Sequence, residues 1–233
     1  MQKGDKVCFI GPGAYAKYTA APALHSVKVP DRVNDRLAAG AYMQGLAATA
    51  LVFETCQINP GQRALVHAAA GGVGLWLCQL LARKQVRVIA TTSTADKRAM
   101  ALDHGAEVAL AYEKDDIVNR VQDVTHGTGV DVVFDGVGKA TLETNLAGLQ
   151  RKGTLVMHGT ASGDPGKDFR ISCLTPKNIR FLKQTVMNYL ASRDEVDSYA
   201  GQVFDALASE SVSVRISKEY ALQDAGQAHQ VSA

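Results

Sequence analysis

The chain of 233 residues contains no long hydrophobic run and little excess charge. No apolar stretch approaches the roughly 20 residues that a membrane-spanning helix needs. The polar start Met1–Asp5 also lacks the apolar segment of a signal peptide. A formal net charge of +2 argues against a strongly basic surface for nucleic acid or anionic membranes. We therefore expect a globular, cytoplasmic protein that has no membrane segment.

Cysteine is scarce, and the familiar metal and nucleophile patterns are missing. The four cysteines show no C-x-x-C spacing, which argues against a disulfide framework and a zinc knuckle and favours reduced thiols. No phosphate-binding Gly-Lys-Ser/Thr loop and no Ser-His-Asp arrangement is present. The cysteines are Cys8, Cys56, Cys78 and Cys173.

A glycine-rich segment, Arg63–Gly74, carries the strongest functional signal. It predicts a short buried strand, a tight turn and the start of a helix. Its spacing matches G-x-G-x-x-G, with Ala69 in place of the first glycine, followed by Gly71 and Gly74. Small residues let the backbone approach a pyrophosphate, and the helix N-terminus offers unpaired N–H groups. We predict dinucleotide binding; the alternative is a glycine-rich turn that only packs.

The residues after the second predicted strand, 86–90, indicate which dinucleotide binds. NAD-binding sheets usually carry a carboxylate there that accepts from the ribose 2′-hydroxyl. This chain has Thr91–Thr94 instead, and no carboxylate before Asp96, which is followed by Lys97 and Arg98. Hydroxyls and a cation suit a 2′-phosphate, so NADPH is favoured over NADH. The alternative for Lys97 and Arg98 is a solvated first helical turn.

Strand and helix patterns alternate from about residue 63 to 157, with glycines between them. This alternation predicts a doubly wound, parallel α/β sheet that binds ligands beyond the carboxyl ends of its strands. The first forty residues differ, because two short strand patterns there are too small to bury a core of their own. The expected strands are 6–10, 14–20, 64–67, 86–90, 107–111, 130–135 and 154–158, and the expected helices are 42–57, 72–84, 95–104, 115–125 and 139–149.

Several motifs resemble the zinc-independent medium-chain dehydrogenases/reductases, specifically the NADPH:quinone oxidoreductase (zeta-crystallin-like) group. The matching segments are Gly4–Val7, Gly13–Ala16, Pro60–Gly61, His67–Gly74, Gly129–Asp135, Arg151–Gly153, His158–Gly163 and Leu174–Lys177. The resemblance implies a Rossmann sheet beside a partial GroES-like β domain. It also implies a chain truncated at both ends relative to the family, with a catalytic-domain remnant at 1–41, an NADPH-binding domain at 42–208 and an incomplete return segment at 209–233.

The resemblance also implies roles for single residues. Gly71–Val73 would hold the phosphates, Ser93 and Lys97 the 2′-phosphate, and Tyr112 would lie near the adenine ribose. His158–Thr160 would lie by the nicotinamide. The cofactor site implied in full is Thr49, Ala70, Gly71, Gly72, Val73, Ser93, Lys97, Tyr112, Gly136, His158, Gly159 and Thr160, with Tyr42 and Lys183 facing the substrate; no catalytic residue and no metal ligand is assigned.

Single residues also have structural alternatives. His67 suits a structural polar role better than acid–base chemistry, and Tyr42 suits a core position at the start of its helix. His158 fits a packing role as well as a place against the nicotinamide. Departures from the family pattern at Gly136, His158–Thr160 and Lys183–Gln184 leave the substrate open.

Three functions follow from these patterns and the resemblance. The first is NADPH-dependent reduction of quinones, and the second is reduction of α,β-unsaturated aldehydes or ketones on the same scaffold. The third is non-catalytic NADPH binding in a crystallin-like or RNA-binding protein, although the charge gives RNA binding no support. The resemblance further implies a homodimer, with residues 178–185 as the segment to examine.

Overall fold

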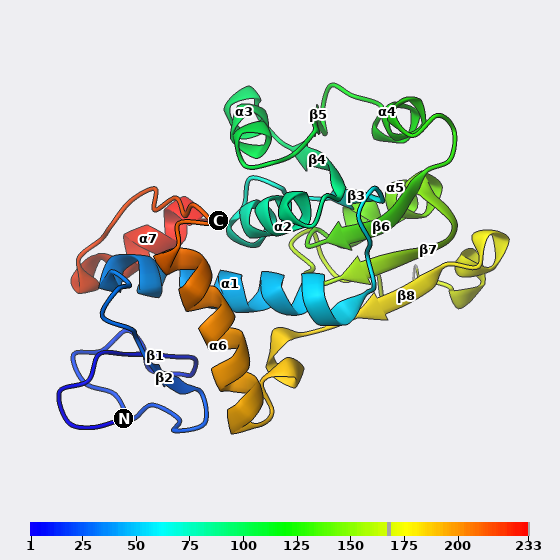
Figure 1. Cartoon of the computed structure of the whole chain (residues 1–233). Helices are drawn as coiled ribbons and strands as arrows, with labels where there is room; N and C mark the ends of the chain where they lie inside the picture. Colours follow the sequence, from blue (N-terminus) through cyan, green and yellow to red (C-terminus); the bar gives the residue numbers. More distant parts are fainter. Residues whose placement is uncertain (167–168, 233) are drawn as a thin grey trace. The chain divides into compact units, whose positions relative to one another are not determined.

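The computed structural model describes residues 1–166 and 169–232, and the chain forms two compact units. One unit is Ala47–Asn188; the other combines Met1–Leu46 with the chain from Tyr189 on. Figure 1 colours the first unit from cyan to yellow and shows the two ends of the chain in blue and in orange to red. These units do not follow the expected bounds at 41 and 208, so the division into a catalytic and a cofactor-binding domain remains a prediction.

The larger unit is built on a six-stranded sheet in the order β5-β4-β3-β6-β7-β8. All five pairings in this sheet are parallel, as the alternating pattern predicts. The order reverses between β3 and β6, which is where a doubly wound sheet leaves a crevice for a ligand. The strands are β3 (Arg63–Val66), β4 (Arg87–Thr92), β5 (Val108–Ala111), β6 (Val130–Asp135), β7 (Leu149–Met157) and β8 (Arg180–Lys183).

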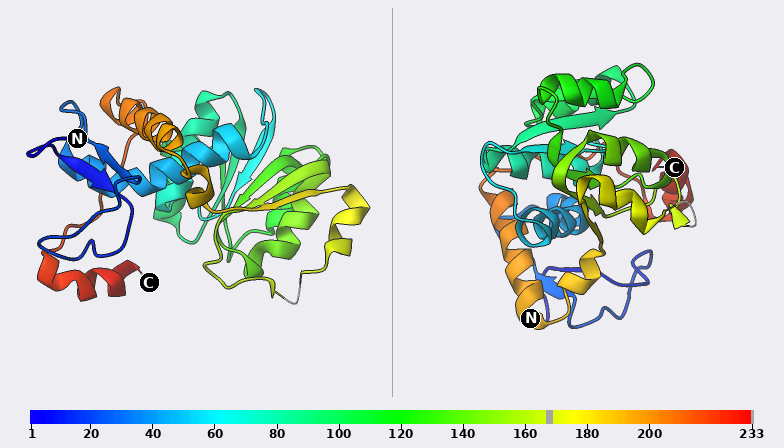
Figure 2. Two further views of the ribbon diagram at one scale, coloured as in Figure 1. Left: turned by 90° about the horizontal axis from the view of Figure 1, so that it is seen from below. Right: turned by 90° about the vertical axis from the view of Figure 1, so that its right-hand side faces the viewer.

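Helices connect the strands and cover both faces of the sheet (Figures 1 and 2). The β3-β4-β5 connections and the β5-β6-β7 connections run in opposite directions, so right-handed crossovers place α2 and α3 on one face and α4 and α5 on the other. Leu65, Ile89 and Val133 are fully buried between these layers. The helices are α2 (Gly72–Arg83), α3 (Ala95–Asp103), α4 (Ile117–Val124) and α5 (Leu142–Gly148), which follows the 3₁₀ turn η2 (Lys139–Thr141).

The other unit contains a two-stranded antiparallel sheet of β1 (Val7–Phe9) and β2 (Ser26–Lys28). It also contains α6 (Arg193–Ala208), which begins with a complete capping box from Ser192, and α7 (Ala225–Ser232) after the 3₁₀ turn η6 (Leu222–Asp224). The strand expected at 14–20 is wrong, because that segment pairs with no strand of the described residues and leaves Tyr15 and Tyr18 70% and 83% exposed.

The largest further differences from the expected boundaries are in α1 and β7. Helix α1 (Asp35–Ala50) begins before Tyr42 and ends in a π-helical turn, η1 (Leu51–Thr55). Strand β7 begins at Leu149 rather than Thr154, because the expected helix 139–149 ends at Gly148. The 3₁₀ turn η4 (Ile171–Lys177) lies between β7 and β8, and the 3₁₀ turn η5 (Val186–Tyr189) follows β8.

Within the described residues, no helix has the length and hydropathy that crossing a bilayer requires.

Candidate cofactor site

The glycine turn between β3 and α2 leaves its backbone open. Gly71 is the N-cap of α2 and contributes no capping side chain, so the first N–H groups of the helix face outward unpaired by a side chain. The turn is closed by a hydrogen bond from Gly71 N to Ala68 O of 2.9 Å, with Ala68 at φ 50°. A Cβ on Gly74 would lie 2.4 Å from Ala68 O, so the motif's last glycine is required by the turn itself.

A small cavity of about 170 Å³, here called the lysine cavity, opens beside this turn. Lys97 Nζ, from the first turn of α3, donates to Oγ of Ser93, which precedes the helix, at 3.2 Å. None of the described residues that line the cavity is acidic. The lining comes from the segments after β3, β4 and β5 and from the start of α3: Ala68, Ala70, Gly71, Thr92, Ser93, Lys97 and Tyr112. The structure therefore brings together five residues that the sequence placed at one cofactor: Ala70, Gly71, Ser93, Lys97 and Tyr112.

A second cavity of about 440 Å³, here called the isoleucine cavity, shares Tyr112 with the lysine cavity. It lies between the start of α4 and the turn after β6, and its apolar lining includes Ile117, Val118 and Val137. Sequence reasoning missed this cavity, since its apolar residues follow the ordinary helix and strand periodicity and carry no motif. His67, Asp115, Asp116, Ala140, Thr141 and Thr144 complete its lining.

Buried polar groups connect the strand ends beneath these cavities. His67 is 2% exposed, stacks on Tyr112 with ring centroids 5.8 Å apart, and hydrogen bonds to Tyr112, Thr91 and Asn145. Burial lowers the pKa of the His67 imidazole and raises that of the Tyr112 phenol, which favours the neutral form of both side chains. These contacts fit the structural polar role that the sequence favoured for His67, and the Tyr112 hydroxyl is hydrogen bonded to His67, Thr91 and Ala68 N.

At the ends of β6 and β7 the backbones are packed closely. His158 N donates to Asp135 O at 2.8 Å, and a Cβ on Gly159 would lie 2.6 Å from Gly136 O. A Cβ on Gly136 would lie 2.9 Å from His158 Cε1, so the imidazole ring occupies the space that a side chain at 136 would fill. His158 Nε2 is buried without a hydrogen-bond partner among the described residues, and burial lowers the His158 pKa to about 4. Exposed Thr160 follows on the same loop.

The remaining predicted site residues have varied surroundings. Gly72 is exposed and Val73 half-buried in the first turn of α2, beside Gly71, while Thr49 is 2% exposed within α1. Lys183, at the end of β8, is ion-paired with Asp164, which lowers the Asp164 pKa.

Tyr42 belongs to the other unit. It is 4% exposed and stacks on Phe204 of α6 at 5.5 Å between ring centroids. Burial raises the Tyr42 pKa to about 12. Its core packing fits the structural alternative, although it lies inside α1 and not at the start of the helix.

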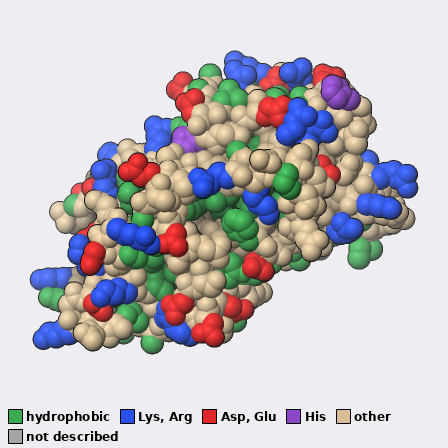
Figure 3. All heavy atoms as spheres, in the orientation of Figure 1, with side chains coloured by type: hydrophobic (Ala, Val, Ile, Leu, Met, Phe, Trp, Pro, Cys, Tyr) green, Lys and Arg blue, Asp and Glu red, His purple; other side chains and the backbone are tan. Residues whose placement is uncertain are grey.

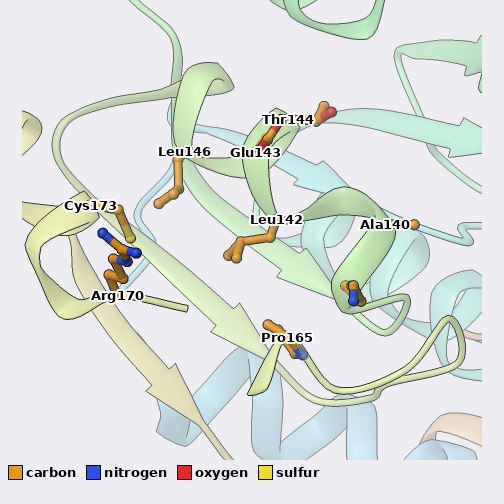
Figure 4. Close-up of a pocket in the computed structure, with 9 residues that line it drawn as sticks. Ala140, Leu142, Glu143, Thr144, Leu146, Pro165, Arg170 and Cys173 are labelled. Atoms are coloured by element: carbon orange, nitrogen blue, oxygen red, sulfur yellow. The ribbon is translucent and has the colours of Figure 1, made fainter. Parts of the chain in front are cut away.

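A third cavity, of about 610 Å³, lies between α5 and the segment after β7 (Figure 4). Leu142 and Leu146 project into it from α5, and Arg170 and Cys173 line the opposite side. No sequence motif marks it, and it shares Ala140 and Thr144 with the isoleucine cavity. Among the described residues, no group of three or more His, Cys, Asp or Glu side chains is arranged to hold a metal ion.

Comparison with known proteins identifies the family. Residues 72–204 match the zinc-binding dehydrogenase family. A probable quinone oxidoreductase of Schizosaccharomyces pombe is 37% identical over 227 residues, which cover 97% of this chain and 68% of the relative. A mycobacterial structure complexed with NADPH superimposes with a TM-score of 0.92 at 39% identity, over 97% of this chain and 70% of that one. Escherichia coli quinone oxidoreductase, also complexed with NADPH, superimposes with a TM-score of 0.95 at 32% identity, over 100% and 72%. The chain belongs to the quinone oxidoreductase group of the medium-chain dehydrogenases/reductases.

Proposed function

We propose that this NADPH-dependent oxidoreductase binds its cofactor along the carboxyl ends of β3–β7 and transfers reducing equivalents from it to a quinone. The observation that carries the proposal is the lysine cavity, where Gly71, Ser93 and Lys97 meet within one small space. A hydroxyl and an ammonium group beside a glycine turn suit phosphate, and the described lining contains no carboxylate that would repel it. Bound NADPH would supply the hydride or electrons.

The glycine turn is suited to hold the pyrophosphate. The N-terminal N–H groups of α2 carry a partial positive charge and have no competing side-chain cap at Gly71. Exposed Gly72 and half-buried Val73 provide the next backbone donors in line. These backbone donors would hold the two phosphates of the cofactor.

The two cavities on either side of Tyr112 fit the adenosine half of the cofactor. In the lysine cavity, Lys97 and Ser93 would bind the 2′-phosphate. In the isoleucine cavity, Ile117 and Val118 face Val137 and would enclose a flat, largely apolar base. Tyr112 separates the two spaces and would contribute its ring, because its hydroxyl accepts from Ala68 N at 3.0 Å.

The nicotinamide would lie toward Gly136, His158 and Gly159. The unpaired Nε2 of His158 is a polar group that a carboxamide or a quinone oxygen could satisfy. With a pKa of about 4, the His158 imidazole stays neutral at pH 7. The neutral ring can orient a ligand by hydrogen bonding, but it contributes no positive charge. Lys183 and Gln184 at the end of β8 would border the substrate.

We further propose that the enzyme needs no zinc, acts in the cytoplasm and forms a homodimer. The scattered cysteines and the lack of a metal-binding group within the described residues support the first point. Strand β8 ends the sheet with one edge unpaired by the described strands, which supports contact between copies along residues 178–185. On the face that Figure 3 shows, acidic and basic side chains are interspersed, which gives RNA binding no support.

The proposal is tested by cofactor binding and turnover. Titrating the chain with NADPH and, separately, NADH should give saturable fluorescence changes with tighter binding of NADPH. NADPH oxidation should then depend on an added quinone, with an α,β-unsaturated ketone as the competing substrate class. Equal affinity for both cofactors would overturn the 2′-phosphate assignment, and turnover of the enone alone would overturn the quinone assignment.

A further inference from the structure

The two walls of the isoleucine cavity are joined underneath by one buried chain of side chains. Tyr112 forms one wall, and Val137 and Thr141 form the other. Between them lie His67, Asn145 and Asp135, of which Asn145 and Asp135 have no solvent exposure at all. Asn145 is the middle member, and neither its residue type nor its place on α5 marked it as a site residue in the sequence.

Hydrogen-bonding chemistry fixes the direction of this chain at Asn145. A carboxylate only accepts, so the Asn145 amide nitrogen must face Asp135, at 2.7 Å from Oδ2. The Asn145 carbonyl oxygen therefore faces His67 Nε2, also at 2.7 Å, and must accept from it. His67 carries its proton on Nε2, which leaves Nδ1 as an acceptor.

On the Tyr112 side, His67 Nδ1 faces two hydroxyl groups. His67 Nδ1 lies 3.0 Å from the Tyr112 hydroxyl and 2.8 Å from Thr91 Oγ1. The Tyr112 oxygen also accepts from Ala68 N at 3.0 Å, and Thr91 Oγ1 lies 2.7 Å from it. An accepting Nδ1 lets the Tyr112 hydroxyl donate to His67 while its oxygen accepts from Ala68 and Thr91, so every member is satisfied.

On the other side, Asp135 holds the second wall. Its Oδ1 accepts from Val137 N at 2.7 Å and from Gly138 N at 3.2 Å. Its Oδ2 accepts from Thr141 Oγ1 at 2.8 Å as well as from Asn145. The turn that carries Val137 is thus tied to the same carboxylate that orients the Asn145 amide.

From this arrangement we infer that Asn145 is a positioning residue for the cofactor: it sets the His67 tautomer and so fixes the separation of the Tyr112 and Val137 walls. The inference rests on the proposed function for the meaning of the cavity, but the tautomer is a property of the protein alone. A fully satisfied buried network of this kind holds one arrangement, whereas a broken one leaves buried groups unpaired. Asn145 touches no cofactor atom in this scheme.

The test begins with the unsubstituted chain. Histidines labelled with ¹⁵N are observed by long-range ¹H–¹⁵N correlation, and His67 is assigned by its loss in His67→Gln. The expected spectrum shows a neutral imidazole protonated at Nε2. A ring protonated at Nδ1 would overturn the inference without any variant of Asn145 being needed.

The variant Asn145→Leu removes the acceptor and the donor at similar volume. We expect the His67 signal to change tautomer and the dissociation constant for NADPH to rise about fivefold, the equivalent of one ordinary hydrogen bond. Thr125→Val is the matched control, because Thr125 is almost as fully buried and lies at the C-terminal end of α4. Its hydroxyl donates to Val121 O and accepts from Gly129 N. This control should lower stability while leaving the tautomer and NADPH affinity unchanged.

The outcomes distinguish a failure of the Asn145 positioning role from a failure of the proposed function. If Asn145→Leu folds with an unchanged His67 tautomer, or binds NADPH as tightly as the parent, the positioning role is wrong. If the parent chain itself does not bind NADPH while His67 shows the Nε2–H tautomer, the proposed function fails and the wiring of the network stands.

Discussion

The carboxyl ends of β3–β6 and those of β7 and β8 differ in whether their buried polar groups have hydrogen-bond partners. At the first set, His67, Thr91 and Asp135, together with Asn145 of α5, are nearly or fully buried, and each is hydrogen bonded within the protein. At the second set, His158 Nε2 and Gln184 Oε1 are buried and have no partner among the described residues. Both regions border the proposed cofactor.

This difference suggests a division of labour along the cofactor. A satisfied network costs nothing further when a ligand arrives, so the β3–β6 ends can bind the adenosine half rigidly and supply affinity. A buried polar atom without a partner costs about 1–3 kcal/mol until something pairs with it. The β7 and β8 ends therefore reward a ligand with matching polar groups, which makes them suited to choosing what reacts.

Blocking the glycine turn should have the largest effect. Gly71 has φ −78° and ψ 171°, which any residue adopts, and a Cβ there meets only Ala68 O at 3.1 Å. Gly71→Val should therefore fold, yet its methyl groups would occupy the path of the phosphates. Affinity for NADPH and NADH should both fall on the order of a hundredfold, about 2.7 kcal/mol, in a fluorescence titration.

The control for this substitution is Gly201→Ala. Gly201 lies in α6 of the other unit, and an added Cβ meets no atom within 4 Å. Binding of both cofactors should be unchanged, and the free energy of unfolding should rise by about 0.5–1 kcal/mol. Tight cofactor binding by folded Gly71→Val would remove the glycine turn from the site.

Removing the lysine ammonium group should distinguish the two cofactors. A hydrogen bond to a charged group contributes about 1.5–3 kcal/mol, so Lys97→Ala should weaken NADPH roughly 10- to 100-fold. NADH lacks the 2′-phosphate, and its affinity should hardly change. The matched control is Arg98→Ala, since Arg98 does not line the lysine cavity but a neighbouring hollow that shares only Ser93 with it. A loss for Arg98→Ala equal to that for Lys97→Ala would point to general electrostatic attraction and not to a built phosphate site.

Much of the β3–β5 region was predictable from the sequence. Gly71, Ser93 and Lys97 lie at strand ends whose order follows from local alternation, and parallel strands bring their carboxyl ends to one edge. The residues after one strand, hydroxyls and a cation without a carboxylate, are enough to indicate a 2′-phosphate site. Tyr112 joined the prediction by family resemblance, and the structure adds that its hydroxyl is hydrogen bonded to His67, Thr91 and Ala68 N.

The rest depended on contacts between segments distant in sequence. Asn145 and His67 meet across 78 positions, and no local pattern marks a helical asparagine as the centre of a network. The strand expected at 14–20 failed because a β-like composition needs a partner strand, and β1 pairs with β2 instead. Whether Thr49, Tyr42 and Lys183 touch a ligand stays a prediction.

Acidic pH should expose the cost of the buried His158. In the folded chain the His158 pKa of about 4 lies below the ordinary value of 6.5. Between these two pH values, His158 is therefore mostly protonated in the unfolded chain and mostly neutral in the folded chain. The free energy of unfolding is therefore unaffected by the titration of His158 above pH 6.5 and declines as the pH falls from 6.5 toward 4. Between pH 7 and 5 the free energy of unfolding should drop by about 2 kcal/mol from His158 alone, to which His67 adds in the same direction.

This pH effect is measured by urea unfolding at the two pH values. His158→Phe should lose about 2 kcal/mol less than the parent over this range. His126→Asn is the control, because His126 is exposed and asparagine tolerates its φ of 53°. An equal pH-dependent loss for the parent and His158→Phe would mean that His158 titrates normally in the folded protein.

The smallest effect concerns the contact between Gly136 and His158, and it tests whether the β7 end is packed against the β6 end through that ring. Gly136→Ala places a methyl group 2.9 Å from His158 Cε1, an overpacking that should cost about 1–2 kcal/mol in urea unfolding. With His158→Ala already present, the same methyl group has room and should cost almost nothing. Gly148→Ala, whose Cβ would make only an ordinary 3.7 Å contact with Val121, controls for the change of residue type. Equal costs for Gly136→Ala in both backgrounds would show that the two residues do not share this space. The His158 ring would then not be the group that packs the β7 end against the β6 end, and it would no longer distinguish the β7 end from the fully hydrogen-bonded ends of β3–β6.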